Sequence, residues 1–281
     1  MMTADSTRAA RSLQALDIII VNYNTRQDLA ACLRSLQVAP PTRPHTIVVV
    51  DNGSSDDSVG ATRRDFPAAR IIEMGRNAGF AAANNAGIRA TASPLIVLLN
   101  SDTIVPAGAL DRLAERLEAT GAVAAGPRLR DGRGWPEMSW GAMLTPLSEW
   151  RQATLVRANA HGERRATSRV KALTAAEREV DWVSGACLLV TREAAVAAGL
   201  LDERYFMYEE DVDFCAALRA GGGRILFTPA AEITHLRGRS MTNAPARRPS
   251  HYDESHLKFY EKHAPQWVPW LRLWKRVRGR I

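Results

Sequence analysis

The sequence predicts an α/β protein built on an open, mostly parallel sheet, and two observations lead to this prediction. Four short, mainly apolar runs, at residues 16–21, 47–50, 70–74 and 95–99, alternate with helical patterns. Three of the four stop abruptly at polar clusters that contain Asn22, Asp51 and Asp102. Continuous β-branched runs are typical of parallel strands buried on both faces, and ligands bind such sheets outside the carboxyl ends of the strands.

Helices are expected between these strands. Thr25 is placed to cap a helix in which leucines recur at helical spacing. Residues 77–90 begin as a glycine-containing loop and become alanine-rich, which predicts a loop leading into a helix. A further helix is expected over residues 110–117.

The second half of the chain is less regular. We expect an irregular or helical insert between residues 128 and 179, where tryptophan, arginine and proline interrupt the pattern. Order returns with a strand over 181–191 and a helix over 192–198. The segment 206–220 predicts an acidic start followed by a helix that closes at three glycines, and strands at 224–227 and 232–235 complete the core.

The bulk composition limits the class of protein. A chain of 281 residues with 46% hydrophobic residues can bury one large core or two adjoining ones. The net charge of +7 indicates an anionic partner, which leaves nucleic acid, an acidic membrane surface and a phosphorylated substrate open. The three cysteines are widely spaced, which predicts buried free thiols in a reducing compartment. No apolar stretch has the length of a signal peptide or a membrane span, so a cytoplasmic protein is expected.

Two aspartates at strand ends are candidates for binding a nucleotide. Asp51 can accept the imide N–H of a uracil or thymine ring, although it can equally start an ordinary Asx-type turn. Asp102 is a hard oxygen ligand suited to Mg²⁺ or Mn²⁺, and its alternative role is to cap the helix expected near Pro106. The loop around Arg76 and Gly79 offers a guanidinium for phosphate and a close backbone approach. Phosphate-binding P-loop and dinucleotide-binding glycine motifs are not present in the sequence.

An acidic cluster later in the chain is a candidate for acid–base chemistry. Glu209, Glu210 and Asp211 are adjacent, with Asp213 close behind, at the start of a predicted helix. Mutual repulsion can raise the proton affinity of one member to that of a general base, whereas the structural alternative is acidic enrichment of a first helical turn. His235 ends a predicted strand and is a candidate contact for a metal or a diphosphate, or a structural histidine.

In combination these motifs resemble glycosyltransferase family 2, whose members have the GT-A fold and invert the anomeric carbon. The resemblance extends from about residue 16 to residue 263. It implies a Rossmann-like nucleotide-binding sheet continuous with a smaller acceptor-binding lobe, and a nucleoside-diphosphate sugar as donor. The implied donor contacts are Asn22, Tyr23, Asn24, Asp51, Asn52, Arg76, Asn77, Gly79, Phe80, Asn84 and Ser101.

The same resemblance implies the catalytic and metal residues. Asp51 resembles the aspartate that recognises the base, and Asp102 resembles the last residue of the DxD-type metal motif, in which Asn100 replaces the first aspartate. Glu210 and Asp211 resemble the catalytic pair, with Asp211 as the base, and His235 corresponds to a metal or diphosphate contact. The acceptor side is implied for Trp182, Gly185 and Ala186.

The branch most similar is that of bacterial rhamnosyltransferases, which implies transfer of L-rhamnose from dTDP-rhamnose, with a UDP-sugar as the other donor class. The acceptor is expected to be a saccharide or a polyprenyl-linked saccharide. The chain has no QxxRW motif of the processive synthases, so one sugar per binding event is expected. We therefore expect four segments along the chain: a flexible tail (1–15), a nucleotide-sugar-binding half (16–127), an acceptor-binding and catalytic half (128–263) and a basic amphipathic C-terminal helix (264–281).

The C-terminal segment 267–281 alternates tryptophan and aliphatic residues with arginines and lysine at helical spacing. A basic amphipathic helix suits an anionic membrane surface, and the alternative is a surface helix that packs its tryptophans on the core. The sequence is also compatible with three other classes of protein: a nucleic-acid-binding protein, a sugar nucleotidyltransferase and a catalytically silent binding module. Acidic strand ends would repel nucleic-acid phosphates, so no nucleic-acid partner is expected.

Overall fold

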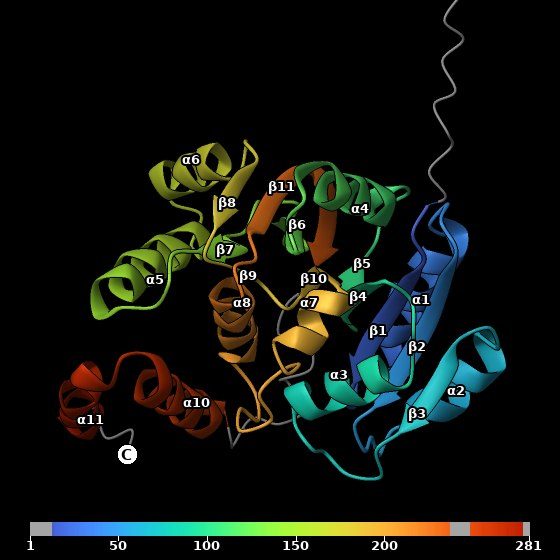
Figure 1. Cartoon of the computed structure of the whole chain (residues 1–281), viewed down its shortest axis with the longest axis horizontal. Helices are drawn as coiled ribbons and strands as arrows, with labels where there is room; N and C mark the ends of the chain where they lie inside the picture. Colours follow the sequence, from blue (N-terminus) through green and yellow to red (C-terminus); the bar gives the residue numbers. More distant parts are fainter. Residues whose placement is uncertain (1–12, 237–247, 278–281) are drawn as a thin grey trace, which may run out of the picture.

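A computed structural model of the chain describes residues 13–236 and 248–277. Its centre is a twisted sheet (Figure 1), in which the first four strands pair in parallel in the order β3-β2-β1-β4. These strands are β1 (Leu16–Asn22), β2 (His45–Asp51), β3 (Arg70–Glu73) and β4 (Leu95–Asn100). All four predicted strands are confirmed, and their carboxyl ends lie at one edge of the sheet.

The second half of the chain continues the same sheet. The strand β10 (Cys187–Thr191) lies antiparallel between β4 and β6 (Ala124–Arg130), and β6 pairs in parallel with β11 (Ile225–His235). The strands β5 (Thr103–Ile104) and β8 (Arg178–Val180) pair with β11. One sheet therefore joins the two halves of the chain.

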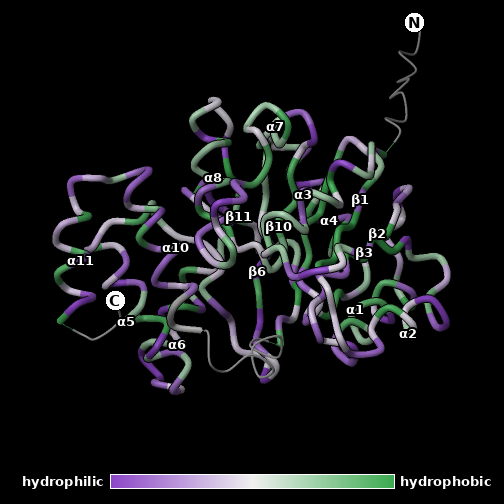
Figure 2. Tube along the Cα trace, turned by 90° about the horizontal axis from the view of Figure 1, so that it is seen from below, coloured by the Kyte–Doolittle hydropathy of each residue, from purple (hydrophilic) through white to green (hydrophobic). Residues whose placement is uncertain are grey.

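Helices cover both faces of the sheet, and each face has its own apolar core. Alternate residues of β1 point to opposite faces, so Ile18 belongs to one core and Ile19 to the other. The first face is covered by α1 (Arg26–Val38) and α4 (Ala109–Thr120), with α2 (Ser58–Asp65) beside α1. The second is covered by α3 (Phe80–Arg89), α7 (Arg192–Ala197) and α8 (Glu210–Ala220). Figure 2 shows the hydrophobic residues concentrated along the central strands.

The second half differs from the sequence prediction at three places. The single strand expected over 181–191 is wrong, because β9 (Trp182–Val183) pairs with β7 (Trp140–Gly141) in a separate small sheet before the chain turns at Ser184 and enters β10. The two strands expected at 224–227 and 232–235 are one strand, β11, whose register shifts at Pro229, where a ladder donor is lost. The strand β6 was not predicted at all.

The insert is largely helical, as expected, and consists of α5 (Pro146–Ala160) and α6 (Arg164–Leu173). The chain ends with α10 (Arg248–His263), a short 3₁₀ turn η1 (Pro265–Trp267) and α11 (Val268–Val277). In Figures 1 and 2 α5, α10 and α11 gather at one end of the molecule, and β2, β3 and α2 lie at the other. Residues 1–12 of the expected tail, residues 278–281 of the expected helix, and Arg237 and Arg239 lie outside the described residues.

All three cysteines, Cys32, Cys187 and Cys215, are buried free thiols, as the sequence predicted. Burial raises the pKa of Cys32 and of Cys215 to about 12, which keeps these groups protonated and inert. Among the described residues, the helices are all too short or too polar to cross a lipid bilayer.

Candidate active site

Asp51 is held in a fixed orientation at the end of β2. It lies opposite Asn22 in the pairing of β1 with β2. The Nδ2 group of Asn22 donates to Asp51 Oδ1 at 3.0 Å, and the backbone N–H of Ser54 donates to Oδ2 at 3.0 Å. The Asx-type turn expected as a structural alternative is therefore present. The same turn orients the Asp51 carboxylate, so the turn and recognition of a base are compatible roles for this residue.

Asn22 and Ser101, both predicted as donor contacts, are buried. Asn22 is fully buried and accepts a hydrogen bond from Thr25 Oγ1 at 2.7 Å. Thr25 Oγ1 in turn lies 2.9 Å from Ser101 Oγ. This chain of hydrogen bonds connects the end of β1 to the segment that carries Asp102, so these side chains position the two aspartates from within.

The loop between β3 and α3 is fastened to the end of β2 by Asn52. Its Nδ2 donates to Asn77 Oδ1 at 2.9 Å and to the carbonyl of Gly79 at 3.2 Å, and its Oδ1 accepts from the N–H of Ala78 at 2.9 Å. Gly53 has a φ of +79°, and a Cβ there would lie 2.6 Å from the carbonyl carbon of Arg76. Only a glycine allows the two loops to approach this closely.

The remaining predicted donor contacts differ in exposure. Arg76 is exposed and Tyr23 is half-buried. Asn24 has a φ of +53°, and its Oδ1 accepts from the N–H of Ser55 at 2.7 Å, which ties the end of β1 to the turn after Asp51. Asn84 is fully buried and donates to the carbonyl of Phe80 at 3.0 Å, so it supports the start of α3.

Asp102 meets His235 at the end of β11. His235 Nε2 lies 3.3 Å from Asp102 Oδ1, and His235 Nδ1 lies 3.6 Å from Glu137 Oε2. Burial disfavours the charged imidazole, but the two carboxylates outweigh it and raise the pKa of His235 to about 9. Asp102 does not cap a helix, because α4 starts at Ala109 with Gly108 as its cap. The two carboxylates thus favour positive charge at this point, which either a proton on His235 or a divalent cation in its place supplies.

The residues around Asp102 fit a divalent cation that is completed by substrate oxygens. Asn100 Oδ1 is buried close by in sequence without a hydrogen-bond partner. Within residues 13–236 and 248–277, no three His, Cys, Asp or Glu side chains form a complete metal site. Asp102 and His235 would therefore hold such an ion with oxygens from a diphosphate, a ligand set that Mg²⁺ and Mn²⁺ accept.

Asp211 occupies the start of α8 and is oriented by two backbone groups. The N–H of Gly185 donates to Asp211 Oδ2 at 2.8 Å, and the N–H of Val212 donates to Oδ1 at 2.9 Å. Burial raises the pKa of Asp211 in spite of these hydrogen bonds. Its neighbour Glu210 is buried, and burial together with the charge of Asp211 raises the pKa of Glu210 well above its ordinary value. Asp211 is thus a carboxylate with increased proton affinity beside a neutral carboxyl.

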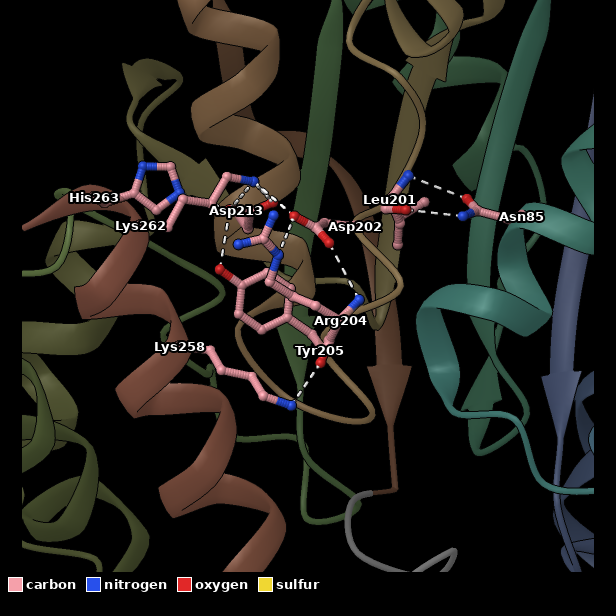
Figure 3. A network of polar contacts seen from close by, with 9 residues as sticks. All are labelled: Asn85, Leu201, Asp202, Arg204, Tyr205, Asp213, Lys258, Lys262 and His263. Atoms are coloured by element: carbon pink, nitrogen blue, oxygen red, sulfur yellow. Dashed lines mark hydrogen bonds and ion pairs between the residues drawn. The ribbon is translucent and has the colours of Figure 1, made fainter.

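The other acid of the helix, Asp213, belongs to a separate structural network (Figure 3). It is 2% exposed and lies 2.6 Å from His263 Nε2 and 2.8 Å from Lys262 Nζ, both on α10. It also accepts a hydrogen bond from Tyr205 at 3.2 Å. Tyr208 and Glu209, just before α8, adopt positive φ values of 71° and 67°, a strained conformation for residues other than glycine. The network anchors α8 next to this strained turn.

The predicted donor loop, acceptor segment and base meet at one point. A Cβ on Gly185 would lie 3.3 Å from Asp211 Cβ and 3.6 Å from Phe80 Cε1. Phe80 is attached in turn to the segment before α8, because its N–H donates to the carbonyl of Phe206 at 2.8 Å. On the acceptor side, Trp182 Nε1 donates to the carbonyl of Ala142 at 2.9 Å, whereas Ala186 is buried and accepts from the N–H of Asn100.

Comparison with known proteins identifies the family. The family model described as glycosyl transferase family 2 matches residues 17–180. The chain belongs to glycosyltransferase family 2. It is 30% identical over 286 residues to the N-acetylglucosaminyl-diphospho-decaprenol L-rhamnosyltransferase of Mycobacterium tuberculosis (strain ATCC 25618 / H37Rv), a match that covers 92% of this chain and 88% of that protein. The rhamnosyltransferase-like branch that the motifs indicated is thereby confirmed, and the chain is a glycosyltransferase.

Two further matches are to more distant proteins. The low-salt glycan biosynthesis hexosyltransferase Agl10 of Haloferax volcanii is 27% identical over 214 residues, which cover 74% of this chain and 62% of Agl10. The crystal structure of GalNAc-T7 with UDP, GalNAc and Mn²⁺ matches with a TM-score of 0.67 at 15% identity and covers 92% of this chain. The chain spans about half the length of that protein. This likeness confirms the GT-A fold.

The structure of this family 2 glycosyltransferase adds residues that the sequence did not single out. Glu137 faces His235, and Phe206 receives the hydrogen bond of Phe80. Glu137 follows β6, a strand that was not predicted because its AAGPRLR sequence contains glycine, proline and two arginines. Glu137 itself belongs to no recognisable motif, so the sequence did not indicate a role for it.

Proposed function

We propose that this enzyme transfers one L-rhamnose from dTDP-rhamnose to a hydroxyl of a polyprenyl-linked saccharide, with inversion at the anomeric carbon. The observation that carries the proposal is the meeting of Asp211 with Gly185 and Phe80, which joins a base to the donor loop. The rhamnosyltransferase that shares 30% identity over nearly the whole chain supports the choice of sugar and of acceptor.

The donor site follows from the strand ends. Asp51, aimed by Asn22 and Ser54, is suited to accept the imide N–H of a thymine or uracil base, and the exposed Arg76 offers a cation to the diphosphate. GalNAc-T7 was solved with UDP and Mn²⁺, which supports a divalent cation in this family of folds. Held by Asp102 and His235, a bound Mg²⁺ or Mn²⁺ would neutralise charge on the departing nucleoside diphosphate.

Asp211 supplies the base for an in-line displacement. Its carboxylate accepts the proton of the acceptor hydroxyl as the oxygen bonds to the anomeric carbon and the bond to the diphosphate breaks. The raised pKa of Asp211 brings it closer to the working pH, which is the condition for efficient general-base catalysis. General-base help of this kind is worth about 10²- to 10⁴-fold in rate.

The acceptor class fits attachment to a membrane surface. A polyprenyl-linked saccharide resides in a bilayer, and α11 carries two exposed basic residues, Arg272 and Arg276, beside exposed tryptophans. We infer that the enzyme binds the inner face of the cell membrane peripherally through this helix.

A donor panel tests the proposed function. The enzyme is incubated with Mg²⁺ or Mn²⁺, a lipid-linked N-acetylglucosamine acceptor and each of dTDP-rhamnose, UDP-glucose and UDP-N-acetylglucosamine, and the released nucleotide is identified by chromatography. We expect dTDP-rhamnose to be consumed fastest, with release of dTDP. Release of pyrophosphate would indicate a nucleotidyltransferase, and equal consumption of all donors in the absence of acceptor would contradict transfer.

A further inference from the structure

A large apolar groove lies between α5, α10 and α11, at the end of the molecule where Figures 1 and 2 show these helices together. Its volume is about 1080 Å³. The apolar lining is contributed mainly by Leu144, Trp150, Val156, Trp270, Leu271 and Trp274. A pocket of this size accommodates an extended hydrocarbon chain or a molecule of the size of a cofactor.

Much of this apolar surface is open to solvent. Trp150 is 66% exposed, Trp270 is 68% exposed and Leu273 is 55% exposed. Large apolar side chains that are exposed together mark a place where another molecule binds, because water contact with them is unfavourable. Neither α5 nor α11 covers the groove fully.

Apart from the exposed Arg157, the polar side chains that line the groove are neutral or paired. His256 Nε2 lies 2.8 Å from Glu149 Oε1, and Lys275 forms a buried ion pair with Asp253. Glu209 is buried, and its burial and the nearby charge of Asp211 raise the pKa of Glu209 to about 8, so it is mainly protonated at neutral pH. The floor of the groove therefore presents little uncompensated charge, which suits an apolar occupant.

One wall of the groove is formed by the start of the catalytic helix. Glu209 and Val212 line it, and in the sequence they flank the pair Glu210 and Asp211. Trp182, from the segment that leads to Gly185, lines it as well. A molecule in the groove therefore lies against the helix turn that carries the base.

We infer that this groove binds the prenyl chain of the lipid-linked acceptor and delivers the linked saccharide to Asp211. The inference rests on the proposed function and identifies where its acceptor binds. The apolar lining matches the hydrocarbon, and Arg157, which also lines the groove, offers a guanidinium to the anionic diphosphate that links chain and sugar. The position of the groove beside the first turn of α8 favours this occupant over a second copy of the chain or a flat bilayer surface, neither of which has to lie near the base.

The test blocks the groove without touching the catalytic machinery. Ala153 lies on α5, lines the groove and is exposed, so Ala153→Trp fills the space at little cost to folding. Ala160→Trp, at the exposed end of the same helix and outside the groove, is the matched control. The KM of each variant is measured with dTDP-rhamnose and two acceptors that carry the same saccharide diphosphate, one on a long prenyl chain and one on a short alkyl chain.

We expect Ala153→Trp to raise the KM for the long-chain acceptor about tenfold or more, equivalent to about 1.4 kcal/mol, and to leave the KM for the short-chain acceptor unchanged. Ala160→Trp should change neither. Equal effects on both acceptors, or no effect on either, would overturn the inference.

The inference would also be overturned if Ala153→Trp abolished binding to acceptor-free vesicles or converted a dimer to a monomer, because the groove would then be a bilayer or self-association surface. Absence of transfer to both acceptors by the wild-type enzyme would refute the proposed function itself, whereas transfer without preference for the long chain refutes only this inference.

Discussion

Asp211 and Asp213 carry the same carboxylate two residues apart, yet their surroundings give them different tasks. Asp211 is half-buried, meets no cation and is held by the backbone N–H groups of Gly185 and Val212. Asp213 is buried against Lys262, whose charge neutralises it, and against His263. A base must be able to take up a proton from the substrate, and a carboxylate enclosed by cations cannot do this easily.

Substitution of each aspartate by asparagine should separate catalysis from stability. We expect Asp211→Asn to lower kcat at least about 10²-fold with little change in Tm, because general-base help is lost while the fold keeps its contacts. Asp213→Asn should instead destabilise the protein by about 2 kcal/mol, since it removes the charged partner of Lys262 and of His263 on α10. Single-turnover rates and thermal unfolding of both variants are the measurements. Near-normal turnover by folded Asp211→Asn would remove this residue from the mechanism.

The buried carboxyl of Glu209 predicts a specific pH dependence of stability. Its pKa is raised from the ordinary value of 4.5 to about 8 by burial and by the charge of Asp211. Between these pH values the folded state keeps a proton that the unfolded state has released, so this group's contribution to stability is present below pH 4.5 and is lost as the pH rises toward 8.

Glu209→Gln should therefore become more stable than the wild type as the pH rises, by about 2–4 kcal/mol at pH 8, while the difference vanishes near pH 4. Urea unfolding at a series of pH values measures this difference. Glu115→Gln, at an exposed position of α4, is the control and should show no such trend. A pH-independent difference for Glu209→Gln would mean that Glu209 is already ionised in the folded protein.

Sequence alone identified the residues whose position follows from local pattern. Asp51 and Asp102 follow buried strands, and Asp211 opens a helix, so each lies where the chain direction changes. The supporting contacts could not be predicted in this way, because Glu137 meets His235 and Phe206 meets Phe80 only when segments about a hundred residues apart fold together. The sequence also could not show whether Asn22 contacts the ligand or only orients Asp51 from a buried position. Both roles place an amide side chain at the end of a strand.

At the scale of elements, the loop before α3 shows how the donor side is joined to the catalytic helix. Gly79 has a φ of +93°, and a Cβ there would lie 2.6 Å from the carbonyl oxygen of Phe206. The same carbonyl accepts the N–H of Phe80, the first residue of α3. The donor loop and the turn before α8 are therefore in direct backbone contact.

Gly79→Ala should push these two segments apart. We expect a loss of about 2–4 kcal/mol in stability from the strained φ and the backbone clash, together with an increase in the donor KM. Gly75→Ala is the matched control, because Gly75 also has a positive φ of 70° but no atom lies within 4 Å of its Cβ position. It should cost about 1–2 kcal/mol and leave the donor KM unchanged. Equal donor KM values for the two variants would show that the contact with Phe206 does not shape the donor site.

Element boundaries were predicted best where a strand is buried on both faces. β1, β2 and β4 are continuous apolar runs, and their sequence resembles no other kind of element. The segment 181–191 has the same character, but its middle is occupied by Ser184 and Gly185, whose turn delivers the N–H that binds Asp211. The requirement of the site overrides the strand propensity there, which explains why the single strand was a wrong prediction.

At the scale of the whole molecule, α10 and α11 link the catalytic helix to the far end of the chain. α10 contacts α8 through Asp213, and α11 is attached to α10 by the buried pair of Lys275 and Asp253. Trp270 and Trp274 of α11 are 68% and 43% exposed. The tryptophans of this helix are therefore only partly covered by the rest of the molecule.

This arrangement determines how membrane binding has to be tested. Deletion of the segment after Pro265 would remove Lys275 and leave its buried carboxylate partner uncompensated, which costs about 3–5 kcal/mol and confuses unfolding with loss of binding. The double substitution Trp270→Ser and Trp274→Ser keeps Lys275 and removes only exposed apolar surface. We expect it to weaken binding to vesicles that contain anionic lipid by about tenfold or more, with no change in Tm, because exposed tryptophans are the groups that enter the interface.

Binding of the wild-type enzyme to these vesicles should also weaken as salt is added, because salt screens the attraction of Arg272 and Arg276 to anionic lipid. Val38→Ser changes an exposed apolar residue of α1, a helix that Figure 1 shows far from α11, and this control should bind as the wild type does. Undiminished vesicle binding by the double variant would exclude Trp270 and Trp274 as the groups that enter the membrane.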